Sequence, residues 1–331
     1  MKKNFVHASL ALAAVGAVGA SCAQAQHKEP SYPVKPVRLV VPFPPGGTPD
    51  LQGRMLTEKL ASRLGQQIVI DNRGGANGII GMEVVARSPA DGYTIIIATV
   101  GNYSVHPHLY KLPYDPLKDF APIIHIGTTP GLVAVHPSVP VKSVNELIAL
   151  ARQRPGELNY GSAGVGGFGH MCGALFTVMT KTKMAHVSYK GLAGALTDLI
   201  AGNIQVSMNS ALPTIPHVKS GRVRALATTG SKRLGILPDL PTVAEAGVPG
   251  YENVTWSAIG APARTPQPVI ERLNREFAAV LALPDVKERF TASGTTITGG
   301  SPEWFHEYWK SELAKYGKLI KEAGIKPDYR S

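Results

Sequence analysis

Two glycine-rich loops contain the residues best suited to bind a ligand. The first loop follows a valine-rich run and holds Phe43, Gly46, Gly47, Thr48 and Asp50. Its prolines stiffen the chain, and its glycines let backbone N–H groups approach a ligand closely. A helix is predicted to begin beside it, and the free N–H groups and dipole of a helix N-terminus favour an anion. The loop is therefore predicted to bind an anionic group, although a tight turn capped by Asp50 would use the same residues.

The second loop lies between a short apolar run and another predicted helix. It holds Ser162, Gly166, Gly167, Phe168 and His170. Glycines at 164, 166 and 169 match the GxGxxG dinucleotide fingerprint. That fingerprint also needs an acid about twenty residues later to hold a ribose, and residues 184–190 (MAHVSYK) contain none. We therefore expect a site for a carboxylate or phosphate and no nucleotide cofactor.

Some of these residues have a purely structural alternative, because Phe43 and Phe168 could pack in the core and His170 could cap its helix. No catalytic or metal-binding pattern accompanies the two loops. The sequence has no GxxxxGK[ST] loop and no HExxH, and a nucleophile elbow at Ser162 would need a leading glycine that is missing. His106 and His108 are expected to be solvated. Cys172 lies in an apolar stretch, as expected of a buried and inert thiol. We predict no catalytic residue, no metal site and no cofactor.

Short apolar runs alternate with helical stretches along the chain. Strands predicted at 37–42, 67–71 and 93–99 are separated by helices at 50–64 and 77–87. This order is typical of a parallel sheet covered on both faces. The further predicted elements are strands at 131–135, 158–161, 186–189, 206–209 and 223–228 and helices at 143–153, 168–180, 192–201, 265–284 and 301–324. Thr99, Thr128 and Asn209 are expected at strand ends that line a cleft.

The N-terminus is typical of a cleaved secretion signal. Two lysines precede an uncharged run at 8–20, and small residues at 23 and 25 predict cleavage after Ala25, so that residues 1–25 form the signal peptide. Acylation of Cys22, as in a lipoprotein, is the less favoured alternative because the usual leucine three positions earlier is missing. The chain carries a formal net charge of +11, which would attract anions but by itself is more typical of a soluble surface with scattered charges. Its basic residues are not interleaved with aromatic ones, so nucleic acid is not an expected partner.

Several short segments, taken in order, resemble one protein family. They are residues 38–47 (RLVVPFPPGG), 71–73 (DNR), 91–94 (DGYT), 112–116 (LPYDP), 158–162 (LNYGS), 189–191 (YKG), 224–227 (RALA) and 240–247 (LPTVAEAG). Together they make the chain similar to the Bug family, the periplasmic substrate-binding receptors of tripartite tricarboxylate transporters. The resemblance extends over nearly all of the chain that follows the signal.

This resemblance implies an α/β protein with the type II periplasmic-binding-protein fold, in which two crossing strands join two α/β lobes. Crossings near Ile126 and Val254 would divide the chain into lobe 1, residues 26–126 plus 255–331, and lobe 2, residues 127–254. Such a receptor captures a small organic carboxylate by hinge closure and delivers it to membrane transporter subunits. A periplasmic monomer without enzymatic activity is expected. There are two alternatives. One is a secreted enzyme, nucleotide-dependent or hydrolytic, that uses the GxGxxG loop. The other is a ligand-sensing receptor for a membrane signalling partner.

Asn209 departs from the usual pattern of this family, in which many relatives carry an aspartate at the same strand end. Losing an acid there removes a partner for a ligand ammonium group. It also relieves the repulsion between that acid and a ligand carboxylate. The hypothesis is that the receptor disfavours amino acids and prefers di-, tri- or aromatic carboxylates without an amine.

Overall fold

The computed structural model describes residues 32–322 and 324–325. The predicted signal peptide, its cleavage after Ala25 and the alternative acylation at Cys22 lie outside these residues. The described residues from Pro33 onward form one compact unit. Within the described part, no helix combines the length and the apolar character that crossing a bilayer requires.

Three parallel strands near the N-terminus confirm the predicted alternation of strands and helices. Strand β1 pairs with β2 on one side and with β3 on the other. Helix α1 covers one face of this sheet, where its Gly53 lies against Leu39, Ile70 and Ile97. Helix α2 covers the opposite face around Val40. The bounds are β1 (Val37–Val41), α1 (Thr48–Leu64), β2 (Ile68–Asn72), α2 (Ile79–Ala86) and β3 (Thr94–Thr99).

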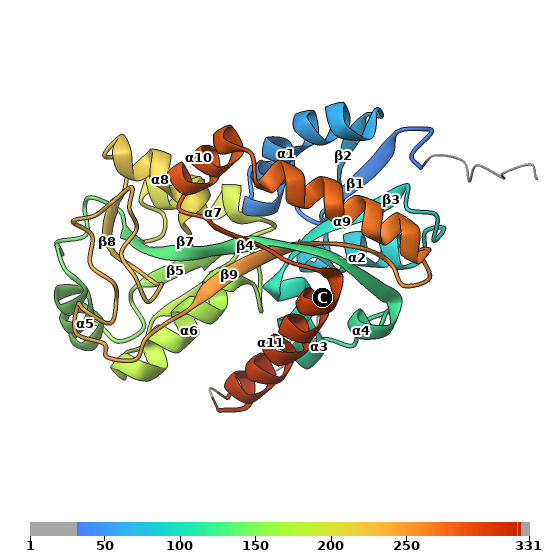
Figure 1. Cartoon of the computed structure of the whole chain (residues 1–331). Coiled ribbons are helices and arrows are strands. Elements are labelled where there is room, and N and C mark those ends of the chain that lie inside the picture. The colour runs from blue at the N-terminus through green and yellow to red at the C-terminus, as the bar shows by residue number, and fades with distance from the viewer. Residues whose placement is uncertain (1–31, 323, 326–331) are drawn as a thin grey trace, which may run out of the picture. The chain divides into compact units, whose positions relative to one another are not determined.

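Two strands connect this sheet to a second one. Strand β4 (Phe120–Val135) is much longer than the strand predicted at 131–135. Up to Pro130 it pairs with β9 (Val254–Pro262), and from Gly131 onward it pairs with strands of the second sheet. Figure 1 shows β4 and β9 running alongside each other between the helices of the two sheets. Each sheet with its helices is one lobe, so that the expected two-lobed α/β fold with two crossing strands is confirmed.

The second lobe is built like the first. Strand β5 is parallel to β6 and to β7, whereas β7 and β8 are antiparallel to β4. Helices α5 and α6 cover one face around Val133 and Met208, and α7 and α8 cover the other. Ser143 caps α5 by accepting a hydrogen bond from the backbone N–H of Glu146. The bounds are α5 (Val144–Gln153), β5 (Asn159–Ser162), α6 (Phe168–Thr180), β6 (Ala185–Ser188), α7 (Leu192–Ala201), β7 (Val206–Ser210), α8 (Ala211–Lys219) and β8 (Arg224–Thr228).

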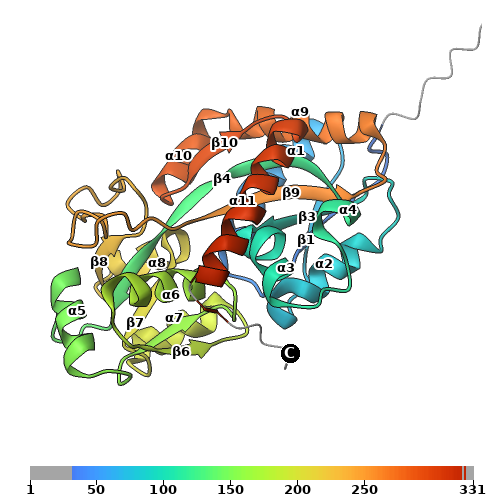
Figure 2. The same ribbon diagram turned by 90° about the horizontal axis from the view of Figure 1, so that it is seen from below.

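The C-terminal elements belong to the first lobe. Helix α9 is joined to α1 by an ion pair between Arg63 and Glu276, and β10 pairs with β4. Helix α11 packs its aromatic side chains on Tyr103 and Trp256, and Figure 2 shows it lying across β9 and β4. The prediction that Pro284 only ends a helix is incomplete, because this proline also begins α10; proline is favoured in a first helical turn. The bounds are α9 (Gln267–Leu281), α10 (Pro284–Ala292), β10 (Thr296–Gly299) and α11 (Pro302–Glu322).

Candidate ligand-binding cleft

A small chamber of about 70 Å³ lies where loops of the two lobes meet. We call it the inner chamber. Its walls come from the β1–α1 loop, from the end of β3 with the turns that follow it, from the β5–α6 loop, and from the end of β7. The lining residues are Phe43, Pro44, Gly47, Thr48, Pro49, Asn77, Thr99, Gly101, His106, Ala163, Gly167, Phe168, Gly169, Leu192, Asn209, Ser210 and Thr255. Both glycine-rich loops singled out in the sequence therefore meet at one place.

The predicted site residues fall into three groups. Those that line the inner chamber are Phe43, Gly47, Thr48, Thr99, Gly167, Phe168 and Asn209. Those that lie in or beside the same loops without lining it are Gly46, Asp50, Ser162, Gly166 and His170. The expectation that Thr128 ends a strand beside the cleft is wrong, because it lies in the middle of β4, between Trp256 of β9 and Thr296 of β10.

Asp50 holds the first loop in place, but it is not the helix cap that we expected. Helix α1 begins at Thr48 and its capping residue is Gly47, so Asp50 is the third helical residue. Its buried carboxylate accepts the Gly46 N–H at 2.9 Å and pairs with Arg54 at 3.0 Å. Burial raises the pKa of Asp50, but hydrogen bonds from Arg54, Gly46 and Asn72 outweigh that effect and leave this pKa below its usual value. The acid is thus neutralised by Arg54 and does not repel an anion in the chamber.

Two buried hydroxyl groups in the inner chamber lack a hydrogen-bond partner. Thr48 and Ser210 are only 5% and 4% exposed, and neither side-chain oxygen has a partner within the described residues. Leaving a buried polar group unpaired costs about 1–3 kcal/mol. Thr48 comes from the first lobe and Ser210 from the second. A polar ligand group between the lobes would satisfy both hydroxyls at once.

Two helices begin at the wall of this chamber. Thr48 is the first residue of α1, and Phe168 is the first residue of α6. The capping residues are Gly47 and Gly167, and both glycines line the chamber. No side chain caps the N–H groups of either helix. Unfilled N–H groups at a helix N-terminus attract anions. The inner chamber is therefore suited to a negatively charged group.

Ser162, Gly166 and His170, which were predicted as site residues, hold the second loop in place without lining the chamber. The Ser162 hydroxyl donates to the Gly164 carbonyl at 3.0 Å and lies 2.7 Å from Nε2 of His186. Nδ1 of His170 accepts the Gly166 N–H at 3.0 Å, so His170 braces the loop instead of capping α6. The rings of His170 and His186 stack at 4.1 Å. Burial lowers the pKa of His170 to about 4 and that of His186 to about 3, so both rings are neutral at neutral pH.

Asn209 is held by two hydrogen bonds, of which an aspartate could not make the one to the Gly161 carbonyl. Its Nδ2 donates to the Gly161 carbonyl and to the Ser207 hydroxyl, both at 2.8 Å. The side chain is buried against Gly169, where an added Cβ would lie 1.9 Å from Oδ1. An ionised aspartate has no donor, so it would place its charge against the Gly161 carbonyl oxygen. Both Asn209 and the glycine at 169 are therefore required by the local packing.

The two lobes touch each other beside the chamber through an interlobe contact formed by Asn77, Tyr110 and Val165. The Val165 carbonyl of the second loop accepts hydrogen bonds from Asn77 Nδ2 at 2.6 Å and from the Tyr110 hydroxyl at 2.8 Å. Asn77 has a φ of 53°, which asparagine tolerates better than most residues. Gly164 gives it room, because an added Cβ there would lie 2.6 Å from the Asn77 side chain. This contact joins the two lobes directly.

His106 was expected to be solvated, and that expectation is wrong. It is fully buried in the short helix α3 (His106–Leu109) and lines the inner chamber. Its Nε2 lies 2.9 Å from Nδ2 of Asn77, and burial lowers the pKa of His106 to about 3. His108 is exposed, as expected. The sequence carried no signal for this difference, because both histidines flank the same proline.

A larger outer chamber of about 750 Å³ adjoins the inner one. The two share Phe43, Pro44, Asn77 and Ala163. Loops from both lobes complete the outer chamber, and Lys190 is the one charged side chain among its lining residues within the described part of the chain. No aspartate or glutamate of that part lines either chamber. The cleft as a whole therefore favours anions.

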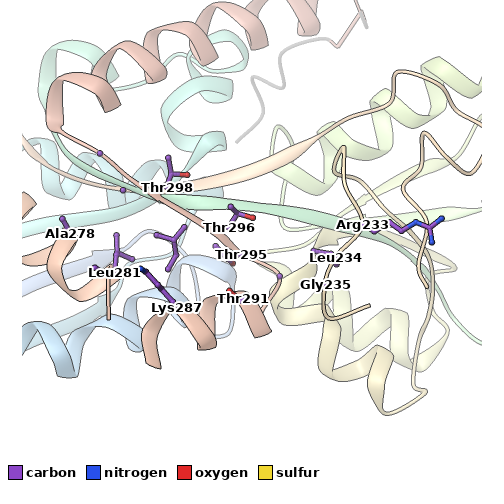
Figure 3. Close-up of a pocket in the computed structure, with 15 residues that line it drawn as sticks. Arg233, Leu234, Gly235, Ala278, Leu281, Lys287, Thr291, Thr295, Thr296 and Thr298 are labelled. Atoms are coloured by element: carbon purple, nitrogen blue, oxygen red, sulfur yellow. The ribbon is translucent and has the colours of Figure 1, made fainter. Parts of the chain in front are cut away.

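A separate pocket of about 640 Å³ lies away from this cleft, between α9, α10, β10 and residues 233–235 (Figure 3). Several threonines and Lys287 line it. Its Arg233 is already paired with Glu245 at 2.9 Å. None of its lining side chains belongs to the buried polar groups that lack a partner among the described residues. The inner chamber is the stronger candidate because three of its lining residues, Thr48, His106 and Ser210, carry such groups.

The described residues contain no group of three or more histidine, cysteine, aspartate or glutamate side chains placed to hold a metal ion. Cys172 is buried, as predicted. Burial raises the pKa of its thiol well above the usual range, so that the reactive thiolate does not form at neutral pH.

Comparison with known proteins identifies relatives over most of the chain. A UPF0065 protein from the tcbD-tcbE intergenic region of Pseudomonas sp. strain P51 is 38% identical, covering 91% of this chain and 90% of that protein. Protein BugT of Bordetella pertussis is 33% identical, covering 89% of this chain and 91% of that protein.

Solved structures agree with the fold. Rpa4515 of R. palustris with adipate is 42% identical, with a TM-score of 0.88, and covers 90% of this chain and 100% of that one. Periplasmic binding protein BugD is 34% identical with a TM-score of 0.86 over the same shares. MatC of Rhodopseudomonas palustris with bound malate is 30% identical with a TM-score of 0.83, covering 87% of this chain and 100% of that one.

These proteins are solute-binding receptors, so the alternative of a secreted enzyme is set aside. The resemblance drawn from the short sequence segments is confirmed. Residues 53–325 match the family described as the tripartite tricarboxylate transporter family receptor, and the chain belongs to that family.

Proposed function

We propose that this protein is a periplasmic receptor that captures a small organic carboxylate between its lobes and delivers it to the membrane subunits of a tripartite transporter. The observation that carries the proposal is the pair of unpartnered, buried hydroxyls of Thr48 and Ser210, one from each lobe. A carboxylate has two acceptor oxygens and would pair with both hydroxyls. The adipate of Rpa4515 and the malate of MatC are both carboxylates.

Binding would proceed by closure of the lobes about β4 and β9. The carboxylate first meets one loop and the N-terminus of its helix, and the second loop then closes over it. In this proposal the ligand contacts come from Phe43, Gly46, Gly47, Thr48, Asp50, Thr99, Ser162, Gly166, Gly167, Phe168, His170 and Asn209, with Ser210 and Asn77 added; Gly46, Asp50, Ser162, Gly166 and His170 act mainly by shaping the loops. The proposed lobes are residues 26–126 plus 255–331 and residues 127–254.

The preferred ligand is a carboxylate without an amine. No acidic side chain in the described part of the chain lines either chamber, so a ligand ammonium group would be desolvated without an anionic partner. Asn209 contributes to this preference, because it stands where many relatives carry an aspartate that could pair with a ligand ammonium group. Its amide is already hydrogen-bonded to Gly161 and Ser207. Dicarboxylates, tricarboxylates and aromatic acids are therefore favoured over aspartate and glutamate.

A titration with matched variants tests the site. Protein comprising residues 26–331 would be unfolded and refolded to remove carried-over ligand and titrated calorimetrically with adipate, malate, citrate, benzoate and glutamate. Thr48→Val keeps the shape of the side chain but removes its hydroxyl. A hydrogen bond to a charged group contributes about 1.5–3 kcal/mol, so this variant should bind the preferred acid about tenfold more weakly or worse.

Thr128→Val is the control, because it makes the same chemical change in the middle of β4. Wild-type affinity is expected for this variant. The proposal fails if no acid binds to the wild type, or if the Thr48 and Thr128 variants bind equally well. Fractionation of cells that express the full chain tests the periplasmic location, and light scattering of the purified protein tests the expected monomer.

A further inference from the structure

We propose that Lys190 binds a second carboxylate of the ligand in the outer chamber, so that the receptor selects linear dicarboxylates over the matching monocarboxylates. This inference rests on the proposed function. It adds a residue that the two glycine-rich loops do not contain, and it names a narrower class of ligand.

The volumes of the two chambers require a ligand of ordinary size to occupy both. The inner chamber holds about 70 Å³ and the outer one about 750 Å³. An engineered protein cavity that admits benzene measures about 150 Å³. The inner chamber therefore encloses a carboxylate group but not a whole six-carbon acid. The remainder of such a ligand must extend into the outer chamber.

The passage between the chambers suits a hydrocarbon chain. The residues common to both chambers are Phe43, Pro44, Asn77 and Ala163. The rings of Phe43 and Pro44 and the methyl group of Ala163 offer no hydrogen bond to a hydroxyl or an amine on the middle of a ligand. Asn77 is the polar member, and its Nδ2 donates to the Val165 carbonyl at 2.6 Å and lies 2.9 Å from Nε2 of His106. Burying methylene groups there is favourable by about 0.8 kcal/mol for each fully buried CH₂. A ligand with polar ends and an apolar middle fits this arrangement.

Lys190 is the cation that the far end of such a ligand would meet. It lines the outer chamber, is exposed, and makes no hydrogen bond or ion pair with any described side chain. Asp198, the acid of the following helix, is occupied by the Tyr189 hydroxyl at 2.6 Å and by Asn203 at 3.1 Å. The Lys190 ammonium group is therefore available for a carboxylate.

The backbone next to Lys190 is placed by the other lobe. Gly191 has a φ of 138°, and an added Cβ there would lie 3.3 Å from the ring of Pro44. Because Pro44 belongs to the first lobe and Lys190 to the second, closure of the lobes brings the cation to the apolar passage. The ligand is thus held at one end by the hydroxyls of the inner chamber and at the other by this ammonium group.

Titration with adipate and hexanoate tests the inference directly. The two acids have the same number of carbons and differ in the second carboxylate alone. Wild-type protein is expected to bind adipate about tenfold more tightly than hexanoate, and Lys190→Met should weaken adipate about fivefold and leave hexanoate unchanged, as befits a partly exposed ion pair. Lys190→Arg keeps the charge and should retain most of the preference for adipate.

Lys183→Met is the matched control, because Lys183 is exposed and lines neither chamber. It should change neither affinity. The inference is overturned if Lys190→Met weakens both acids equally or neither of them, or if benzoate binds and adipate does not. In those cases a carboxylate still binds and the proposed function stands. Absence of binding by adipate, hexanoate and benzoate alike would overturn the inference, and it would overturn the proposed function as well if malate and citrate also failed to bind.

Discussion

Replacing Tyr110 with phenylalanine should weaken the binding of every ligand by the same factor. The Tyr110 hydroxyl donates to the Val165 carbonyl at 2.8 Å. This bond joins the two lobes, so it exists only while they are closed. Tyr110 lines the outer chamber, but its hydroxyl is directed at the Val165 carbonyl and is already engaged there. Its hydroxyl therefore favours the closed form that all ligands need, and it does not distinguish one ligand from another.

The size of the effect follows from the strength of one hydrogen bond. A neutral hydrogen bond contributes about 1 kcal/mol net, which corresponds to about a fivefold change in apparent affinity. The Val165 carbonyl keeps its bond from Asn77 at 2.6 Å in the variant, so no buried acceptor is left unpaired. Asn77→Ala is a less clean test because Asn77 also contacts His106 and has a φ of 53°, which costs alanine about 1 kcal/mol.

Calorimetric titration of Tyr110→Phe with adipate, malate and benzoate measures the effect. Tyr93→Phe serves as the control, since its hydroxyl accepts the Val34 N–H within the first lobe. Whichever acids bind the wild type should bind the Tyr110 variant about fivefold more weakly, with equal ratios, and the control should bind them normally. Small-angle scattering of the ligand-free variant should show a more open form. The reasoning is refuted if a single acid loses affinity while another does not, because Tyr110 would then contact the ligand.

Three further changes have defined outcomes. Asn209→Asp should lower the melting temperature and weaken carboxylate binding at least tenfold in titrations, because the hydrogen bond that the amide donates to the Gly161 carbonyl is lost beside the anion. Gly173→Ala would place a Cβ 2.2 Å from the Tyr160 ring and should cost about 1–3 kcal/mol in urea unfolding, whereas Gly235→Ala, which meets nothing within 4 Å, should be neutral. Burial lowers the pKa of His125 to about 4. Between about pH 6.5 and pH 4 the unfolded chain therefore binds a proton at this histidine that the folded chain does not, and stability falls as the pH falls through this range. His125→Phe should make the fall in unfolding free energy near pH 5 shallower by about 1.4 kcal/mol per pH unit; an unchanged slope would mean that His125 is not neutral when folded.

The two glycine-rich loops could be predicted because their signals are local. Each lies between an apolar run and a helical pattern, and glycine is needed wherever a backbone approaches a ligand or another segment. The predicted helix after the first loop begins two residues later than α1, and the predicted helix after the second loop has the bounds of α6. The prediction that an anion binds at these loops depends on the same local features. The relatives solved with adipate and malate support a carboxylate as the ligand class, and the place of binding stays a prediction.

The errors concern residues whose surroundings come from distant parts of the chain. Thr128 lies in the middle of a strand because β9 and β10, from the far C-terminal part, pair with it. His106 is buried because the second loop of the other lobe closes over it, where Gly166 lies next to its ring. Aspartate is a residue type that often caps helices, but Gly47 occupies the capping position of α1, and the Asp50 carboxylate forms an ion pair with Arg54. No periodicity within a short window contains this information.

Affinity and selectivity can be separated in this receptor because different residues control them. The contact of Asn77 and Tyr110 with Val165 joins the lobes, and its strength sets how much of the free protein is already closed. Thr48 and Ser210 line the inner chamber from opposite lobes, and neither hydroxyl has a partner within the described residues; in the proposed function the ligand supplies that partner. A ligand must therefore supply the hydrogen bonds that these two hydroxyls lack, and it gains the interlobe contact whatever its structure. Loss of the Tyr110 hydroxyl, which is bonded to Val165, should therefore scale all affinities together, whereas changes of Thr48 or Ser210 should alter their order.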